Sequence, residues 1–178
     1  VNTQYILNAI PQEKDIDVLS EKSQGAFFAN RSRILPPSVE TVKTIFGKYS
    51  IEPRGKNCVI FGYGLLVGKP ISHWLTSRGA TVSIINEFTV NPAHYTLNAD
   101  IIISGAGKPN LIKADMIKEG AVIIDFGYNN LDGTITGDAD FDGVSKKSSL
   151  ITPVPGGVGP IVIASVLKNM LTLMKSIK

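Results

Sequence analysis

The feature that most constrains the fold is a series of short, unbroken apolar runs separated by helical segments. Runs such as 101–103 and 121–124 contain no alternating polar residues, which is typical of parallel strands covered on both faces. We expect strands at 58–61, 81–85, 101–103, 121–124 and, more briefly, 150–151. Strands that alternate with helices in this order predict right-handed crossovers and an α/β fold, a doubly wound, mainly parallel sheet of the Rossmann type.

Helical segments are expected at both ends of this region and between its strands. After Pro36 and Pro37, Ser38 is expected to cap a helix that ends near Gly47. Further helices are expected at 70–77 and 92–98, and a long C-terminal helix with an apolar stripe at 160–174. Residues 1–53 are more polar and irregular than residues 54–178, which suggests a boundary between two parts of the chain.

Composition excludes several classes of function. Hydrophobic residues make up 43% of the 178 residues and charged residues 19%, which indicates a soluble globular protein. The net charge of +3 is small and scattered, so no nucleic-acid partner is expected, and no apolar run is long enough to span a membrane. The single cysteine, Cys58, is expected to be a buried thiol, which favours a cytoplasmic location. The two widely spaced histidines predict no metal site.

The segment between the first strand and the first helix has the spacing G-x-G-x-x-x-G. Gly62 allows a sharp turn, Gly64 lets the backbone approach a pyrophosphate, and Gly68 lets the helix pack closely on the sheet. The helix N-terminus also offers free N–H groups and the positive end of a dipole. We therefore expect a dinucleotide to bind here, the alternative being an ordinary tight turn. The expected cofactor-binding residues of this segment are Gly62, Tyr63, Gly64, Leu65 and Leu66.

Glu87 lies just after the second expected strand. A carboxylate at that position accepts hydrogen bonds from the ribose hydroxyls of NAD and repels the 2′-phosphate of NADP. The residue therefore predicts NAD in preference to NADP. The alternative is a solvated charge on a loop.

Three further loops follow strands, at the edge of the sheet where ligands bind in open α/β folds. Small residues after the third strand, Gly105, Ala106 and Gly107, leave room for a cofactor. Asp125 follows the fourth strand, where anchoring of the loop is favoured over a catalytic role. The segment 152–160 has three prolines and three glycines among nine residues, a stiffness that favours contact with a ligand.

Segment 152–160, TPVPGGVGP, resembles the signature of the bifunctional methylenetetrahydrofolate dehydrogenase/methenyltetrahydrofolate cyclohydrolase (FolD) family. The segments VGKP at 67–70, GKP at 107–109, GAVIID at 120–125 and GDADF at 137–141 are similar to further motifs of that family, in the same order. The segment PQEKDID at 11–17 is similar to the family's Pro-x-Lys-Asp-Val-Asp-Gly. The resemblance covers nearly the whole chain and begins midway through the family's length. It thus implies that the N-terminal catalytic lobe is absent, with residues 1–53 as its remnant and connecting helix.

The resemblance implies a nicotinamide cofactor, a folate substrate and a homodimer. Gly62, Tyr63 and Gly64 occupy the family's cofactor-binding Gly-Arg-Ser positions, and Tyr128 lies where a Gly-Ile-Asn segment contacts cofactor. By the same resemblance Asp17 matches an aspartate that binds the pterin ring. The residues expected near substrate are Pro155, Gly156, Gly157 and Val158.

The departures from the family pattern change the expected chemistry. Tyr63 and Glu87 replace the arginine and serine that hold a 2′-phosphate, which agrees with the prediction of NAD. Val18 replaces a family glycine, which leaves folate binding open. No tyrosine has a lysine four positions later, so the family's catalytic pair is absent and no catalytic residue is assigned. We expect loss of the cyclohydrolase step, with either a dehydrogenase or a non-catalytic dinucleotide-binding module remaining.

Overall fold

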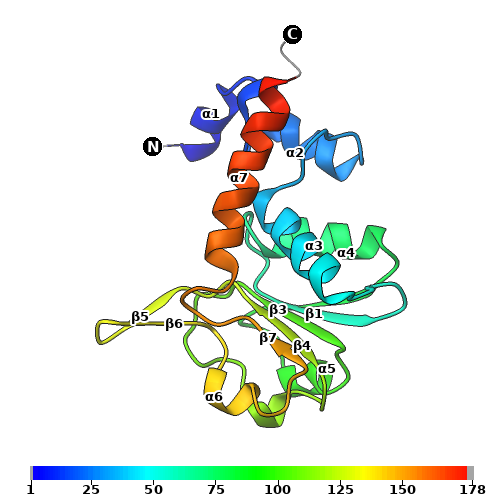
Figure 1. Ribbon diagram of the computed structural model, residues 1–178, viewed down its shortest axis with the longest axis vertical. Helices are drawn as coiled ribbons and strands as arrows, with labels where there is room; N and C mark the ends of the chain where they lie inside the picture. Colours follow the sequence, from blue (N-terminus) through cyan, green and yellow to red (C-terminus); the bar gives the residue numbers. More distant parts are fainter. Residues whose placement is uncertain (1, 176–178) are drawn as a thin grey trace.

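The computed structural model describes residues 2–175, which form a parallel five-stranded sheet flanked by helices (Figure 1). The strands lie in the order β2-β1-β3-β4-β7, and each neighbouring pair is parallel. Their bounds are β1 Asn57–Phe61, β2 Thr81–Ile85, β3 Ile101–Ser104, β4 Val122–Asp125 and β7 Leu150–Ile151. The doubly wound sheet predicted from the apolar runs is therefore confirmed.

Helices α3, α4 and α7 lie on one side of the sheet, and α5 and α6 lie on the other (Figure 1). A two-stranded antiparallel hairpin, β5 Asn129–Leu131 and β6 Thr134–Thr136, projects away from the sheet. The helices are α1 Thr3–Asn8, α2 Glu21–Phe28, α3 Pro37–Tyr49, α4 Gly68–Ser77, α5 Pro92–Thr96, α6 Phe141–Val144 and α7 Val158–Met174, with short 3-10 turns η1 Gln12–Lys14 and η2 Ala114–Met116. In residues 2–175 no helix is long and apolar enough to cross a bilayer.

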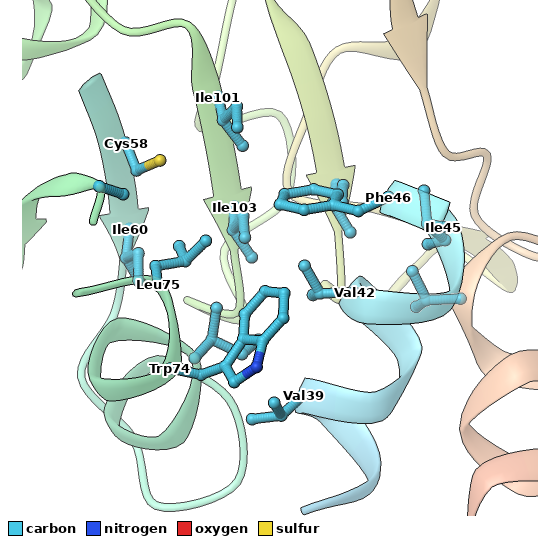
Figure 2. Close-up of a cluster of buried hydrophobic side chains, with 14 of the residues drawn as sticks. Val39, Val42, Ile45, Phe46, Cys58, Ile60, Trp74, Leu75, Ile101 and Ile103 are labelled. Carbon is cyan, nitrogen blue, oxygen red and sulfur yellow. The ribbon is translucent and has the colours of Figure 1, made fainter. Parts of the chain in front are cut away.

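The unbroken apolar runs have a direct structural cause, because alternate residues of each strand enter two different cores. Cys58 and Ile60 of β1 pack in the core beneath α3 and α4, together with Val42 and Trp74 (Figure 2). Val59, between them in sequence, packs in the core on the opposite face. Side chains point to alternate faces of a strand. A strand buried on both faces therefore has no position for a solvated residue.

The helix expected after the double proline begins earlier than predicted, and the prediction that Ser38 caps it is wrong. Pro36 precedes the first helical residue, Pro37, and no side chain caps the helix. Proline suits this place because its ring fixes φ near the helical value and its missing N–H has no partner to lose. The Ser38 hydroxyl does not cap the helix. It donates a hydrogen bond of 2.5 Å to the carbonyl oxygen of Leu66 instead.

The C-terminal end of α3 also differs from the prediction. The helix continues past Gly47 to Tyr49, and Ser50 ends it in the left-handed conformation, with φ 54°. A glycine inside a helix disfavours it by only about 1 kcal/mol. The burial of Ile45 and Phe46 against the sheet outweighs that penalty.

The long α7 helix has its apolar stripe facing outward. Its buried positions include Ser165 and Asn169, and the Asn169 amide donates to the carbonyl oxygens of Ile16 and Leu35 at 2.9 and 2.8 Å. The exposed α7 stripe consists of Ile163, Leu167, Met170, Leu171 and Met174. The amide contacts of Asn169, together with the buried side chain of Leu173 in the core cluster that contains Val18, thus hold this helix to residues 16–35. One core cluster contains Val18 together with strand residues, and the division into residues 1–53 and 54–178 stays a prediction.

We predict that the Cys58 thiol of the folded protein does not react with a disulfide reagent such as Ellman's reagent at pH 8. The side chain is 1% exposed, and burial raises its pKa to about 12, so the reactive thiolate is both scarce and shielded. Labelling should follow the rate of global unfolding, and it should be complete at once in denaturant as a control. Rapid stoichiometric labelling without denaturant would contradict the β1 packing described above.

Candidate functional site

The site lies at the carboxyl edge of the sheet, where the direction of winding changes. The chain moves from β1 outward to β2 and then returns to β3 on the other side of β1. In open α/β sheets the crevice at this switch point is the usual ligand site. A cavity of about 490 Å³ occurs there, bounded by the loops that follow β1, β2 and β3. Its lining includes six of the predicted cofactor residues: Gly62, Tyr63, Gly64, Glu87, Gly105 and Ala106.

Other predicted residues lie beside this lining rather than in it. Leu65 and Leu66 follow Gly64 on the same turn, and Gly107 follows Ala106. Tyr128 is 72% exposed at the base of the hairpin. The lining also contains residues that the sequence did not single out, among them Asn86, Thr89, Lys108 and Leu111. Their position directly beside the expected loops is the only signal that could have identified them.

The turn after β1 depends on two glycines. Gly62 has a φ of +85°, and its amide donates a hydrogen bond of 2.8 Å to the carbonyl oxygen of Ile85 at the end of β2. A Cβ on Gly68 would collide with the Gly62 carbonyl oxygen and would lie 2.8 Å from the Tyr63 Cα atom. This close approach holds the N-terminus of α4 against the sheet, as the spacing predicted.

The same turn presents unused hydrogen-bond donors. Among the described residues, no hydrogen bond joins the amides of Tyr63, Gly64, Leu65 or Leu66 to an acceptor. The Ser38 hydroxyl stabilises this turn by donating a hydrogen bond to the Leu66 carbonyl oxygen. Free amides at the N-terminus of a helix form a site for an anion. The turn therefore fits the pyrophosphate of a dinucleotide.

The loop after β2 is held in shape by Asn86. Its side-chain oxygen accepts a hydrogen bond from the Phe88 amide at 3.0 Å, and its backbone amide donates to the Thr89 hydroxyl at 3.0 Å. Glu87 lies between these anchors and is exposed, and its carboxylate has no partner among the described residues. The carboxylate is thus available to accept hydrogen bonds from ribose hydroxyls.

Asp125, at the end of β4, is an anchor for neighbouring loops. Its carboxylate accepts hydrogen bonds from the amides of Gly127 at 2.7 Å and Ala139 at 2.8 Å. Its own amide donates to the Thr152 hydroxyl at 2.8 Å, which ties β4 to the start of the proline-rich loop. Burial, together with the nearby charge of Asp138, raises the pKa of the Asp125 carboxyl. These contacts agree with the anchoring role that the sequence favoured over catalysis.

The two predicted substrate segments lie at different levels along α7. Pro155, Gly156 and Gly157 immediately precede the helix, and Val158 is its first residue. Asp17 follows Ile16, whose carbonyl oxygen accepts a hydrogen bond from Asn169 of α7. Val158 and Asn169 are separated along the helix by about 16 Å, at 1.5 Å per residue. Burial and the charge of Asp15 raise the pKa of Asp17. A ligand that contacts both segments must therefore be elongated.

The described part of the chain contains no group of three or more His, Cys, Asp or Glu side chains placed to hold a metal ion. The arrangement instead consists of a parallel sheet, a glycine turn with free amides and a carboxylate beyond the next strand. These features together define a dinucleotide-binding domain.

The comparisons with known proteins identify the family. The family described as "Tetrahydrofolate dehydrogenase/cyclohydrolase, NAD(P)-binding domain" matches residues 36–178, so the chain belongs to this family. It is 44% identical over 175 residues to the bifunctional protein FolD 2 of Lactobacillus johnsonii, covering 98% of this chain and 62% of that relative. The chain thus spans less than two thirds of the length of this relative.

Solved structures agree with this assignment. The crystal structure of bifunctional FolD from Campylobacter jejuni superposes with a TM-score of 0.95 at 41% identity, covering 99% of this chain and 63% of that one. The Trypanosoma brucei enzyme, in complex with NADP cofactor and an inhibitor, gives 0.93 at 33% identity, with 99% and 63% covered. These matches confirm the family that the sequence motifs indicated.

We predict that Gly68→Ala lowers the free energy of unfolding by about 2–4 kcal/mol, because the new Cβ forces the Gly62 backbone to move. Urea denaturation measures this change. Gly64→Ala is the matched control on the same turn, because a Cβ there meets no atom within 4 Å, and its effect should stay within about 1 kcal/mol. Equal stability of the two variants would show that α4 does not depend on close contact at Gly68.

Proposed function

We propose that this chain binds a nicotinamide dinucleotide as the cofactor-binding part of a methylenetetrahydrofolate dehydrogenase-like oxidoreductase of one-carbon metabolism. The observation that carries the proposal is the set of free amides at Tyr63–Leu66, because Tyr63 and Gly64 line the cavity at the switch point of the sheet and Leu65 and Leu66 follow them on the same turn. The pyrophosphate lies on these amides, and the adenosine ribose lies near Glu87. The nicotinamide supplies the hydride acceptor, and the residues of this chain bind and orient it.

We propose NAD as the preferred cofactor. Glu87 is exposed at the cavity and has no cation in contact, so its charge would repel a 2′-phosphate at short range. Tyr63 offers no charge to such a phosphate, and the Lys69 ammonium lies 5.7 Å from the centroid of its ring. We assign Lys108, which also lines the cavity, to the pyrophosphate.

The proposed substrate is a folate that lies along α7 between Pro155–Val158 and Asp17, in keeping with the elongated shape that this separation requires. We propose that the cyclohydrolase step is lost, because the sequence has no tyrosine with a lysine four positions later. The homodimer and the cytoplasmic location implied by the resemblance also stay proposals.

A second candidate is a dinucleotide-binding module without turnover. The observation in its favour is that the exposed α7 stripe is left without a cover among the described residues. The two candidates share the cofactor site, and they differ only in whether a bound folate is oxidised.

Calorimetric titration should show NAD binding at least about tenfold more tightly than NADP, which corresponds to about 1.4 kcal/mol. The double variant Tyr63→Arg with Glu87→Ser should reverse the preference, because it exchanges a repelling charge for an attracting one. Glu119→Ser is the control for the charge lost at Glu87, since it removes one negative charge from an exposed residue that precedes β4, at the opposite edge of the sheet. Tighter binding of NADP than of NAD by the unaltered chain would refute the assignment of Glu87.

Mixing the chain with methylenetetrahydrofolate and NAD should produce NADH, measured at 340 nm. We expect slow turnover, because positioning of the two reactants is retained while acid–base assistance, worth about two to four orders of magnitude, is missing. The double variant that disfavours NAD serves as the control for contaminating enzymes. Tight NAD binding with no NADH formed would establish the non-catalytic module.

A further inference from the structure

Asp138 is a completely buried carboxylate that receives five hydrogen bonds from two loops of the site. It is 0% exposed, and no salt bridge to it occurs among the described residues. Its Oδ2 atom accepts from the Ser104 hydroxyl at 2.6 Å, the Ala106 amide at 2.8 Å and the Gly107 amide at 3.2 Å. Its Oδ1 atom accepts from the Lys108 amide at 2.9 Å and the Asn129 side-chain amide at 3.0 Å.

Only an ionised aspartate satisfies this set of partners. A carboxylate accepts at both oxygens and donates nothing, so it can receive all five donors. An asparagine would point its NH2 group at some of them and leave buried donors unpaired, which is strongly unfavourable. The negative charge is stabilised without a cation, because successive backbone N–H groups converge on it as they do on a bound anion.

The two loops held by Asp138 are the ones that the sequence assigned to the cofactor. Gly105 and Ala106 of the first loop line the cavity, and Asn129 of the second follows Tyr128. Gly127 of the second loop also packs against the carboxylate, because a Cβ at this position would collide with the Asp138 side chain. Asp138 therefore fixes the position of both loops relative to each other.

These contacts also decide which loop can bind phosphate. The glycine-rich loop after β3 would otherwise offer consecutive free amides to an anion, but those of Ala106, Gly107 and Lys108 are already bound to Asp138. The amides of the turn after β1 have no such partner among the described residues. The protein's own carboxylate thus occupies one of two adjacent anion sites and leaves the other for the ligand.

We propose that Asp138 is a positioning residue for the dinucleotide. By occupying the anion site of the β3 loop, it holds the backbone of Gly105 and Ala106 as a wall of the cavity and directs the pyrophosphate to the amides of Tyr63–Leu66. The inference rests on the proposed function, since it concerns how the same cavity receives its cofactor. It does not require any turnover.

The test compares Asp138→Asn with Asp132→Asn. Asp132 and Gly133 form the exposed tip of the β5–β6 hairpin, with φ of 50° and 84°, a turn in which Asn-Gly serves as well as Asp-Gly. The two variants change the net charge equally. NAD binding is measured by calorimetry, and amide hydrogen exchange follows Ala106, Gly107 and Lys108.

Asp138→Asn should raise the Kd for NAD at least about tenfold, as expected for loss of charge-assisted hydrogen bonds, and should speed exchange of the three loop amides. Asp132→Asn should leave both unchanged. If the unaltered chain binds no dinucleotide, the proposed function fails. If it binds NAD and Asp138→Asn binds equally well, the proposed function stands and the positioning role of Asp138 is wrong.

A milder variant covers the case in which Asp138→Asn does not fold. Ser104→Ala removes one of the five donors and leaves the carboxylate ionised on the backbone amides. It should raise the Kd for NAD about threefold, because the β3 loop is held less firmly, and should speed exchange at Ala106 and Gly107 more than in the core strands. An unchanged Kd in a folded Ser104→Ala chain would overturn the positioning role.

Discussion

Burial of a parallel sheet on both faces is the constraint on which the rest of this structure depends. The central strands β1, β3 and β4 have no solvated face, so their ends are the only places where polar groups can collect. Because all these strands point the same way, their carboxyl ends meet at one edge. The reversal of winding between β1 and β3 then opens a crevice at that edge. The cofactor cavity therefore follows from the topology, and the loops determine what it recognises.

Buried carboxylates, rather than apolar contacts, give those loops their shape. Asp125 joins the end of β4 to Gly127, Ala139 and Thr152, and Asp138 joins the β3 loop to Asn129. Each charge is surrounded by N–H and hydroxyl donors instead of cations. Such networks are rigid when every partner is satisfied. Loops built from glycine and proline thus acquire one conformation without a core of their own.

The sequence predicted the sheet well, because short unbroken apolar runs between helical segments are typical of parallel strands buried on both faces. It also predicted the Gly62 turn, since that geometry is local and only glycine permits it. It missed the outward face of α7, because periodicity shows that a stripe exists but not what lies opposite it. It also missed Asp138, whose loop partners Ser104–Lys108 lie 30 to 34 positions away. No local pattern connects residues at that separation before the strands are aligned.

The orientation of α7 has a consequence for the behaviour of the chain in solution. Its inward side is held by the buried side chains of Val158 and Leu173 and by polar contacts such as that of Lys168 with Glu40, while the aliphatic and thioether groups of the exposed α7 stripe face water. Salts that are excluded from protein surfaces, such as sulfate, strengthen the association of apolar groups. Such salts should therefore lower the solubility of this protein, because they favour association through the exposed α7 stripe. The exposed α7 stripe is thus one place at which the salt of a crystallisation or storage buffer acts on this protein.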